Sequence, residues 1–269
     1  NIGPAPNFII EHDADIAHVP KDLFPGILKT ARMGYDGKGQ ITVEAAEQLG
    51  NAWAELGKVP CVLEKRVELD FEVSALVVRG FDDSVVAYPV SQNVHRNGIL
   101  HTSTVPAPSL KPAQEKKIIE AAKALIRKID YVGVLCVEFF VLKNGDIVAN
   151  EIAPRPHNSG HYTMDACVSS QFEQQVRAMA RLPLGDTRLL APVSMLNLLG
   201  DLWFEGAEDQ AKEPAWNKVL AHPDAKLHLY GKSAPRMGRK MGHINCLGEA
   251  LNEARQNCAA VATELGIEP

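Results

Sequence analysis

Two glutamates, Glu138 and Glu151, lie on either side of a short segment that contains a strong turn signal. That signal is Asn144-Gly145, the dipeptide most typical of a two-residue type I′ hairpin turn. Such a turn places Glu138 directly opposite Glu151, with Cβ atoms about 4.5–5.5 Å apart. Two carboxylates at this distance repel each other, so a shared proton or a bound cation must stabilise them. Mg²⁺ prefers oxygen ligands and commonly takes one or two carboxylates together with substrate phosphates.

Two other arrangements of this pair stay open. One glutamate can turn toward solvent or pair with an arginine such as Arg155. A one-residue change in loop length would place the two side chains on different faces of the hairpin, because side chains alternate along a strand. We therefore treat Glu138 and Glu151 as candidate metal ligands.

A stiff polar run follows the second glutamate. It reads Ala153-Pro-Arg-Pro-His-Asn-Ser-Gly-His161, and its two prolines restrict the backbone around Arg155. Arginine presents a planar fork that suits carboxylate, bicarbonate or phosphate, and His157 and Asn158 can add hydrogen bonds. A structural histidine is the alternative. The position of the run directly after a candidate metal ligand favours an anion-binding role.

A glycine-rich stretch, residues 34–40, lies between a predicted strand that contains Lys29 and a predicted helix. Such a loop can bring backbone N–H groups to phosphate oxygens, and Lys38 adds charge. It matches neither common nucleotide-binding glycine motif, and a plain tight turn is the alternative. Glu64 and Glu72 can bind ribose hydroxyls or be solvated surface groups.

A basic cluster occurs near the C-terminal end of the sequence. It consists of Lys232, Arg236, Arg239 and Lys240 and is interrupted by glycine and proline. This composition favours an anion-binding loop, with a surface basic patch as the alternative.

Hydrophobic periodicity predicts the elements that position these residues. We expect strands at residues 24–30, 61–63, 71–78, 85–90, 193–199 and 226–230, a hairpin at 135–152, and helices at 43–56, 113–129, 164–180 and up to 265. This mixture of strands and helices predicts an α/β or α+β fold.

The bulk composition excludes several classes of protein. A net charge of −5 over 269 residues, with histidine neutral, argues against nucleic-acid binding. No apolar run approaches the roughly 18–20 residues that a membrane span needs. Five scattered cysteines without a CxxC pair argue against a disulfide framework or zinc site, and we expect them to be small buried residues. A reducing, cytoplasmic compartment fits best.

Taken together, these stretches resemble the ATP-grasp family and, within it, the N5-carboxyaminoimidazole ribonucleotide synthetases. The resemblance is carried by Lys29, Gly34–Gln40, Glu64–Val67, Phe71–Ser74, Tyr88-Pro89, His95, Gly98–Leu100, Asn150–His161 and Arg236–His243. It implies an ATP-grasp fold with a small C-terminal β-containing domain. The implied limits are residues 1–185 for the ATP-grasp domain, with a lid lobe at about 27–88, and 190–269 for the C-terminal domain. The family's N-terminal substrate domain is not matched, so we expect a fragment with weak activity.

The resemblance also implies an activity, namely ATP-dependent carboxylation of aminoimidazole ribonucleotide by bicarbonate, via carboxyphosphate, in purine biosynthesis. It implies ATP and Mg²⁺ as cofactors and a homodimer. Matching positions assign ATP contacts to Lys29, Gly34, Tyr35, Asp36, Gly37, Lys38, Gly39, Gln40, Glu64, Lys65, Arg66, Val67, Glu72, His95, Asn150 and Glu151. They assign metal binding to Glu138 and Glu151, catalysis to Asp36, Arg155, His157 and Lys232, and ribonucleotide binding to Tyr35, Asp36, Lys38, Asn158, Arg236 and Arg239.

Two alternatives are kept. Formate-dependent glycinamide ribonucleotide transformylases have a similar Pro-Arg-Pro-His run, typically followed by Asp-Thr-Gly. Asn158-Ser159-Gly160 in this chain favours the carboxylating enzymes. A non-catalytic nucleotide-binding module is the other alternative, because a domain of the family is not matched.

Overall fold

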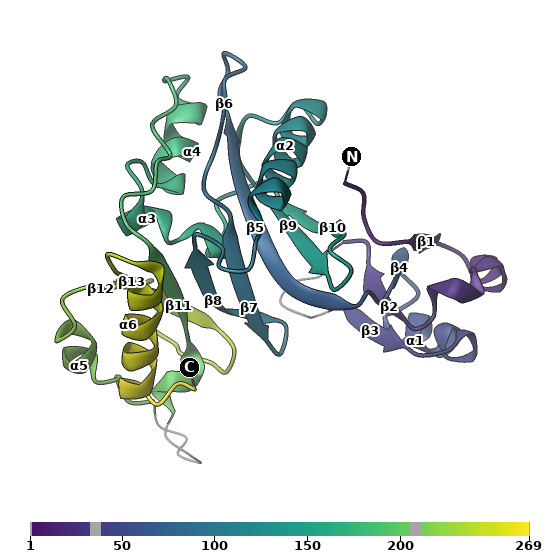
Figure 1. Cartoon of the computed structure of the whole chain (residues 1–269). Coiled ribbons are helices and arrows are strands. Elements are labelled where there is room, and N and C mark those ends of the chain that lie inside the picture. Colours follow the sequence, from purple (N-terminus) through teal and green to yellow (C-terminus); the bar gives the residue numbers. More distant parts are fainter. Residues whose placement is uncertain (1, 33–38, 205–210, 269) are drawn as a thin grey trace. The chain divides into compact units, whose positions relative to one another are not determined.

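The computed structural model describes residues 2–32, 39–204 and 211–268, and Figure 1 shows its elements. The strands are β1 (Asn7–Ile10), β2 (Gly26–Thr30), β3 (Gln40–Val43), β4 (Cys61–Lys65), β5 (Leu69–Arg79), β6 (Val85–Ala87), β7 (Ser91–Arg96), β8 (Ile99–Val105), β9 (Gly133–Leu142), β10 (Ile147–Ala153), β11 (Val193–Leu199), β12 (Ala225–Leu229) and β13 (Lys240–Leu247). The α-helices are α1 (Leu49–Glu55), α2 (Pro112–Lys128), α3 (Thr163–Ala166), α4 (Gln171–Met179), α5 (Trp216–Leu220) and α6 (Leu251–Glu264).

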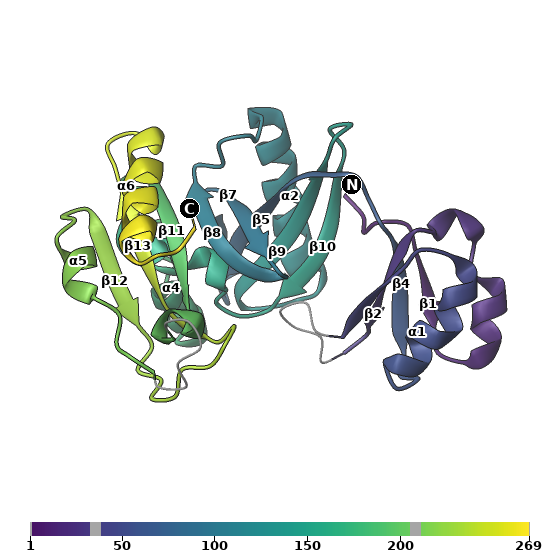
Figure 2. The same cartoon turned by 90° about the horizontal axis from the view of Figure 1, so that it is seen from below.

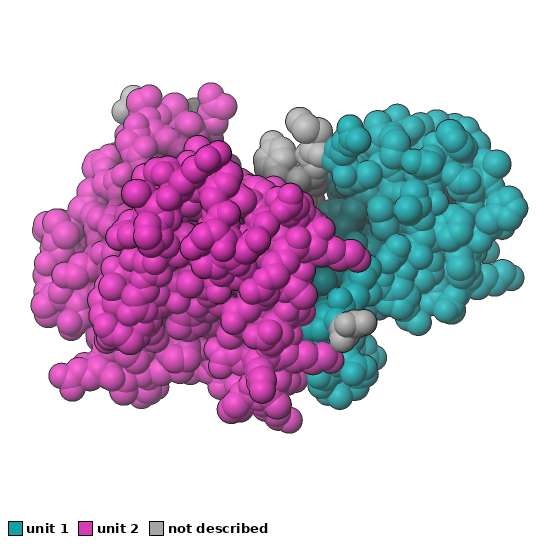
Figure 3. Space-filling model, turned by 90° about the horizontal axis from the view of Figure 1, so that it is seen from above, with its two compact units in different colours: residues 1–70, 97–99, 140–150 teal, residues 71–96, 100–139, 151–269 magenta. Residues whose placement is uncertain are grey.

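The chain folds into two compact units, which are coloured separately in Figure 3. Unit 1 comprises residues 1–70, 97–99 and 140–150, and unit 2 comprises residues 71–96, 100–139 and 151–269. The domain limits expected from the sequence, 1–185 with a lobe at 27–88 and 190–269, stay predictions.

Unit 1 is built on an antiparallel sheet with strand order β1-β4-β2-β3. Its own apolar core includes Leu28, Leu63 and Trp53, which are almost completely buried. The Trp53 indole N–H donates to the Val59 carbonyl oxygen (2.7 Å), so the polar atom of this buried ring is satisfied. This core joins α1 to the sheet.

Unit 2 contains most of a larger sheet with strand order β10-β9-β5-β7-β8-β11-β13-β12, with β6 paired to β5. Residues 133–139 of β9 are buried, as expected for a central strand covered on both faces. Helices α2 and α6 lie on the same face of this sheet (Figures 1 and 2). Helix α2 begins with Pro112, which suits the first helical turn, and it buries Ile118, Ala122 and Ile126 at four-residue spacing.

Two predicted helices differ from the structure. Within the segment expected to be helical at residues 43–56, Val43 ends strand β3 and the α-helix begins at Leu49, because the β-branched run Ile41-Thr-Val43 favours a strand. The helix expected at 164–180 is divided into α3 and α4. Ser170 starts α4 by accepting a hydrogen bond from the backbone N–H of Glu173 (3.1 Å).

The turn of the β9–β10 hairpin also differs from the prediction. The backbone N–H of Gly145 donates to Leu142 O, and Leu142 N–H donates to Asp146 O, each at 2.8 Å. Of the two predicted turn residues, Gly145 has a positive φ (88°) and Asn144 does not. The type I′ prediction is therefore wrong, because that turn requires positive φ at both residues. The loop contains three residues, and Leu142 faces Asp146 where Ile147 was expected.

Other expectations are confirmed. The mixed fold of helices and antiparallel sheets is the predicted α+β architecture. All five cysteines are free and buried. Among the described residues, no helix combines the length and the apolar character needed to cross a membrane.

Candidate active site

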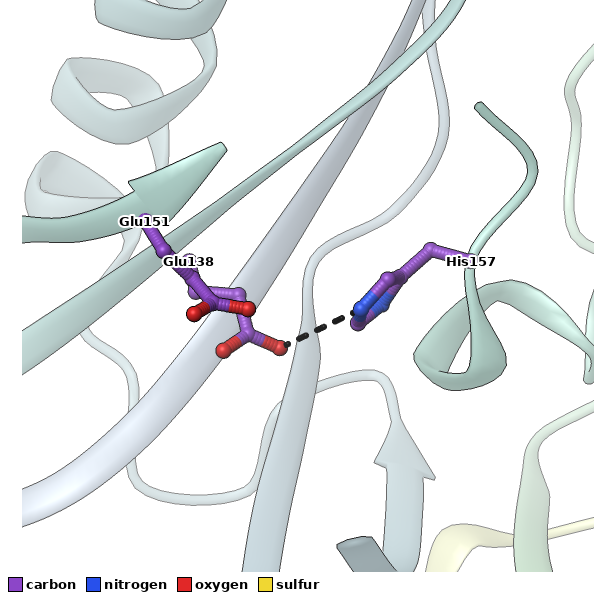
Figure 4. Close-up of side chains that lie close together, drawn as sticks. All are labelled: Glu138, Glu151 and His157. Carbon is purple, nitrogen blue, oxygen red and sulfur yellow. Dashed lines mark ion pairs between the residues drawn. The ribbon is translucent and has the colours of Figure 1, made fainter. Parts of the chain in front are cut away.

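Glu138, Glu151 and His157 bring their side chains together at one point of unit 2 (Figure 4). One ligand atom from each residue lies within 4.8 Å of the other two. Glu138 is buried in β9, Glu151 is exposed in β10, and His157 lies in the loop that follows. The one-residue change in the hairpin loop therefore does not separate the two carboxylates.

A chain of buried polar side chains supports Glu138 from neighbouring strands. Ser74 Oγ in β5 lies 3.4 Å from Glu138 Oε1 and accepts a 2.6 Å hydrogen bond from Asn93 Nδ2 in β7. Asn93 Oδ1 in turn accepts from the hydroxyls of Ser91 (3.2 Å) and Ser103 (2.8 Å). These residues were not predicted as site residues. Satisfied buried networks of this kind hold a side chain in one orientation.

The environment of Glu138 raises its pKa to about 7. Burial is the main cause, and the negative charges of Glu151 and Glu72 act in the same direction, while His95 and the Ser74 hydroxyl oppose it. The ionised form is therefore unfavourable without a compensating positive charge. Two carboxylates that converge in this way form the donor set that a hard divalent cation such as Mg²⁺ prefers.

His157 presents an N–H group toward Glu138. The backbone N–H of Ser159 donates to His157 Nδ1 (3.4 Å), and the Ser159 hydroxyl lies 2.9 Å from the same atom. Because Nδ1 accepts from the Ser159 backbone N–H, the proton of the neutral ring is assigned to Nε2, which is 3.9 Å from Glu138 Oε1. Burial, followed by the charges of Arg155 and Lys240, lowers the pKa of His157 to about 3. His157 is thus a neutral hydrogen-bond donor in the metal-free chain.

Gln171, the first residue of α4, clamps the backbone of His157. Gln171 Oε1 accepts from the His157 backbone N–H, and Gln171 Nε2 donates to the His157 carbonyl oxygen, each at 2.8 Å. Gly160 packs so closely that an added Cβ would lie 2.6 Å from Gln171 Oε1. No local pattern predicts this contact, because glutamine at a helix start has many possible roles.

The other residues of the polar run are arranged for an anion. Arg155 is exposed, with one hydrogen bond from Nη1 to the Pro156 carbonyl oxygen (3.1 Å). Asn158 is only 9% exposed, yet its amide nitrogen and oxygen have no hydrogen-bond partner among the described residues. Buried polar groups are normally paired, so an unpaired amide suggests a missing ligand.

His95 and Glu72 form a second pair in unit 2, with Nδ1 and Oε2 2.8 Å apart. Burial by itself lowers the pKa of His95, but the hydrogen bond and charge of Glu72 outweigh it, so the pKa lies above its ordinary value. The sequence assigned both residues to ATP separately, and the structure shows that they contact each other.

The basic cluster lies mostly in the loop between β12 and β13. Lys232 Nζ donates to Lys240 O (2.5 Å) and lies 5.4 Å from the centre of the Tyr230 ring. Arg239 Nη1 donates to Ala234 O (2.6 Å), and Arg236 is exposed. Burial and the charges of Arg239 and Lys240 lower the pKa of Lys232. Lys240, the fourth member of the predicted anion-binding cluster, begins β13, and its charge lowers the pKa values of both His157 and His161.

Unit 1 holds a separate set of predicted ATP contacts. Lys29 Nζ donates to Glu64 Oε2 (2.7 Å) and to Asn150 Oδ1 (3.2 Å). Gln40 pairs with Lys29 across β2 and β3, and Gly39 (φ 75°) precedes it.

The remaining predicted residues of unit 1 are less informative. Lys65 ends β4, and Arg66 Nη1 pairs with Glu44 Oε1 (2.7 Å). Val67 is partly buried in the connection to β5. Gly34, Tyr35, Asp36, Gly37 and Lys38 lie outside the described residues, so their predicted roles stay predictions.

Comparison with other proteins identifies the family. Residues 4–172 match the ATP-grasp domain, and residues 193–257 match the phosphoribosylaminoimidazole carboxylase C-terminal domain. The N5-carboxyaminoimidazole ribonucleotide synthase of Brucella melitensis is 48% identical over 222 residues, which is 81% of this chain and 58% of the relative. That of Bacillus subtilis is 42% identical over 250 residues, 93% of this chain and 63% of the relative. The chain therefore spans about three fifths of the length of these relatives.

Solved structures show the same similarity. The N5-carboxyaminoimidazole synthase of Aspergillus clavatus, in complex with ADP and 5-aminoimidazole ribonucleotide, has a TM-score of 0.87 and 31% identity. The match covers 98% of this chain and 69% of that one. The fold, the paired carboxylates and these matches lead to one conclusion: the chain belongs to the ATP-grasp family, among the N5-carboxyaminoimidazole ribonucleotide synthases.

Proposed function

We propose that this chain supplies the ATP-binding and bicarbonate-activating residues of an N5-carboxyaminoimidazole ribonucleotide synthase. In this reaction, a bicarbonate oxygen attacks the γ-phosphorus of ATP, and the bond to the β-phosphate oxygen breaks, giving carboxyphosphate and ADP. The exocyclic amine of aminoimidazole ribonucleotide then attacks the carboxyl carbon. Phosphate leaves and the amine loses a proton. The names of the relatives and the ligands of the Aspergillus clavatus structure support these substrates.

The observation that carries the proposal is the convergence of Glu138, Glu151 and the His157 Nε2–H. Glu138 and Glu151 would hold Mg²⁺, which supplies charge neutralisation on the transferring phosphoryl group. His157, fixed as a neutral donor, would hydrogen-bond a bicarbonate or phosphoryl oxygen. Arg155 and the unpaired Asn158 amide would bind the same anion.

The remaining assignments extend this proposal. Lys29, oriented by Glu64 and Asn150, would meet ATP phosphates, and Glu72 would meet the ribose with His95 beside it. Lys232, Arg236 and Arg239 would attract the phosphates of the acyl phosphate and the ribonucleotide. The homodimer and the cytoplasmic location stay predictions.

The direct test measures ADP release by the 269-residue chain with Mg·ATP, in the presence and absence of bicarbonate and aminoimidazole ribonucleotide. We expect bicarbonate to stimulate release and formate to have no effect. Glu138→Gln should reduce stimulated release by about 10²-fold or more, since one ligand of the charge-neutralising group is weakened. Glu120→Gln, an exposed change on α2, is the matched control. Nucleotide binding without bicarbonate-stimulated release would contradict the proposal and favour a non-catalytic module.

Substitution of His157 separates hydrogen-bond donation from proton transfer. His157→Ala should lower bicarbonate-stimulated turnover by about 10²-fold, and His157→Gln, which keeps an N–H donor, should restore part of it. Because the pKa of His157 is about 3, its ring does not titrate between neutral pH and mildly acidic pH. A rate profile with an ionisation near neutrality that disappears in His157→Gln would instead identify the residue as an acid–base group.

A further inference from the structure

A cavity of about 450 Å³ lies within unit 2 beside helix α6. Its volume falls in the range of about 300–1,000 Å³ that is typical of small-molecule sites. Strands β7, β8 and β11 form one wall, and one face of α6 forms the other. The proposed catalytic residues do not line it.

The cavity opens on the sheet face opposite the one that carries the Glu138 network. Side chains alternate along a strand, and Asn93 in β7 points toward Ser74 and Glu138. Its neighbours Gln92 and Val94 therefore point away, and both line the cavity. The same holds in β8, where Ser103 donates to Asn93 while Thr102 and Thr104 line the cavity.

The polar lining is basic. Its charged side chains are Arg96 and Arg255, and the described lining contains no aspartate or glutamate, although the chain carries a net charge of −5. His101 also lines the cavity, and burial followed by the charge of Arg96 lowers its pKa, so it favours the neutral form. Arg96 Nη1 donates to the Glu268 carbonyl oxygen (2.6 Å) and lies 3.8 Å from the Glu268 carboxylate, so the charge of Arg96 is partly compensated. Arg255 is exposed on α6, and no hydrogen bond or ion pair of the described residues involves its guanidinium. Uncompensated arginine in a concave site attracts an anion that can accept its forked N–H donors.

The residues around Arg255 add hydrogen-bonding capacity. Asn252 lies one turn before it on α6, so the two side chains lie on the same face of the helix. Gln92 accepts a bond from the Ser109 backbone N–H at Oε1 (2.9 Å), which orients its amide nitrogen as a donor. Thr104 and Ser194 share a hydrogen bond (3.2 Å) at the cavity wall.

The rest of the lining is apolar and small. Val94 is 47% exposed, although it lies in an interior strand of the sheet, and Leu196, two strands away in β11, is fully buried. Across the cavity, α6 presents Ala259 and Ala262, whose small side chains leave room above the two strands. An exposed valine facing alanines provides a surface for a flat apolar group.

We propose that this cavity binds a small organic anion, a phosphate or carboxylate attached to a flat, ring-sized apolar body. The anionic group is held by Arg255 with Asn252 and Gln92, and the ring lies between Val94 and Ala259. The site is distinct from the proposed catalytic residues, because it is on the other face of the sheet.

The test uses the 269-residue chain and phenyl phosphate as the probe, with binding followed by ¹H–¹⁵N NMR spectra and calorimetry. Inorganic phosphate tests the anion alone, and benzyl alcohol tests the ring alone. We expect saturable binding of phenyl phosphate, with Kd on the order of 1 mM or tighter, and weaker binding of both fragments. Chemical-shift changes should map to β7, β8 and α6.

Two variants test the site by independent routes. Arg255→Gln removes the charge and should weaken phenyl phosphate binding about tenfold or more, the loss expected for one charge-assisted interaction. Ala259→Phe fills the apolar part without changing charge and should also abolish binding. Arg127→Gln, an exposed change on α2, and Glu138→Gln in the proposed active site should leave binding unchanged.

Four outcomes would overturn the proposal. The first is the absence of saturable phenyl phosphate binding, and the second is an equal affinity for inorganic phosphate and phenyl phosphate. The third is an unchanged affinity for phenyl phosphate in both cavity variants. The fourth is concentration-dependent dimerisation of the chain, with chemical-shift changes at the cavity but no response to phenyl phosphate. The last would identify a second copy of the chain as the occupant.

Discussion

Glu138 is a carboxylate in a buried position, where an ionised side chain is unfavourable. Its side chain lies in a strand with Val137 and Phe139 on either side, both almost fully buried, and it faces the charge of Glu151. The Ser74 hydroxyl is a weak partner at 3.4 Å. Without a cation, the protonated form of Glu138 is lower in free energy than it would be in water, relative to the ionised form. This preference raises its pKa to about 7.

This raised pKa predicts a pH dependence of stability in the metal-free chain. Folding raises the pKa of Glu138 from 4.5 to about 7, so between these pH values the folded state binds more protons than the unfolded state. The contribution of this group to the free energy of unfolding is therefore full below about pH 4.5 and is lost as pH rises through about 7, by up to about 3 kcal/mol. Glu138→Gln should flatten this decline in urea denaturation measured across the window.

The control for this experiment is Glu120→Gln, which removes an exposed carboxylate on α2. It should keep the decline of the unsubstituted chain. A decline in Glu138→Gln as steep as in the control would show that Glu138 does not hold a proton in the folded state.

At the scale of elements, the start of helix α4 positions the anion-binding loop. Ser170 caps the helix, and Gln171 immediately after it holds both backbone polar groups of His157. The loop is thus attached through two hydrogen bonds to the first turn of a helix, which restricts its motion. This arrangement lets His157 keep one orientation although it lies outside any strand or α-helix.

Gln171→Leu should remove the two hydrogen bonds that hold this loop and so increase its mobility. The buried N–H and C=O groups of His157 would lose their partners, at a cost of about 2–4 kcal/mol in the free energy of unfolding. We expect bicarbonate-stimulated ADP release to fall, and the affinity for Mg·ADP, measured by calorimetry, to stay close to that of the unsubstituted chain.

The chain offers a matched control for this variant on the same helix. Gln174 is also fully buried and makes the same two-point clamp on Gly185, donating to its carbonyl oxygen (2.7 Å) and accepting from its N–H (2.9 Å). Gln174→Leu should therefore lower stability by a similar amount without a comparable loss of stimulated turnover. Equal losses of turnover in the two variants would assign Gln171 a purely structural role.

At the scale of the whole molecule, the two units have separate apolar cores. Leu63 belongs to the core of unit 1, and Leu196 to a core of unit 2 formed by β11, β13 and α6. Because each core is closed within its own unit, local stability can differ between the units.

Core truncation should reveal this independence in hydrogen exchange measured by mass spectrometry. Leu63→Ala, expected to cost about 2–5 kcal/mol, should accelerate exchange in β1–β4 and leave β11 and β13 nearly unchanged. Leu196→Ala should do the reverse. A uniform acceleration across both units in either variant would show that they unfold as one cooperative body.

The sequence predicted strands best where apolar residues are continuous, as in β9 and β11, and most of the strands that it missed are of mixed polarity. Strands β1, β3, β7, β8 and β13 were not predicted. β7 carries Asn93 and His95 on a face that is covered in the folded chain, and no structure was assigned to this polar segment. Burial of those residues depends on neighbouring strands, which local patterning does not contain.

By itself, the sequence identified the residues that could bind ligands or take part in catalysis. Glu138, Glu151 and the Arg155–Asn158 run lie within a stretch short enough for local spacing and resemblance to assign them. Only the tertiary structure decided how they are supported and charged. The Ser74 contact joins residues 64 positions apart, the Gln171 clamp joins residues 14 apart, and the charge of Lys240 reaches His157 across the fold. Desolvation and through-space charge depend on what packs nearby, so the raised pKa of Glu138 and the neutral state of His157 exist only in the folded chain.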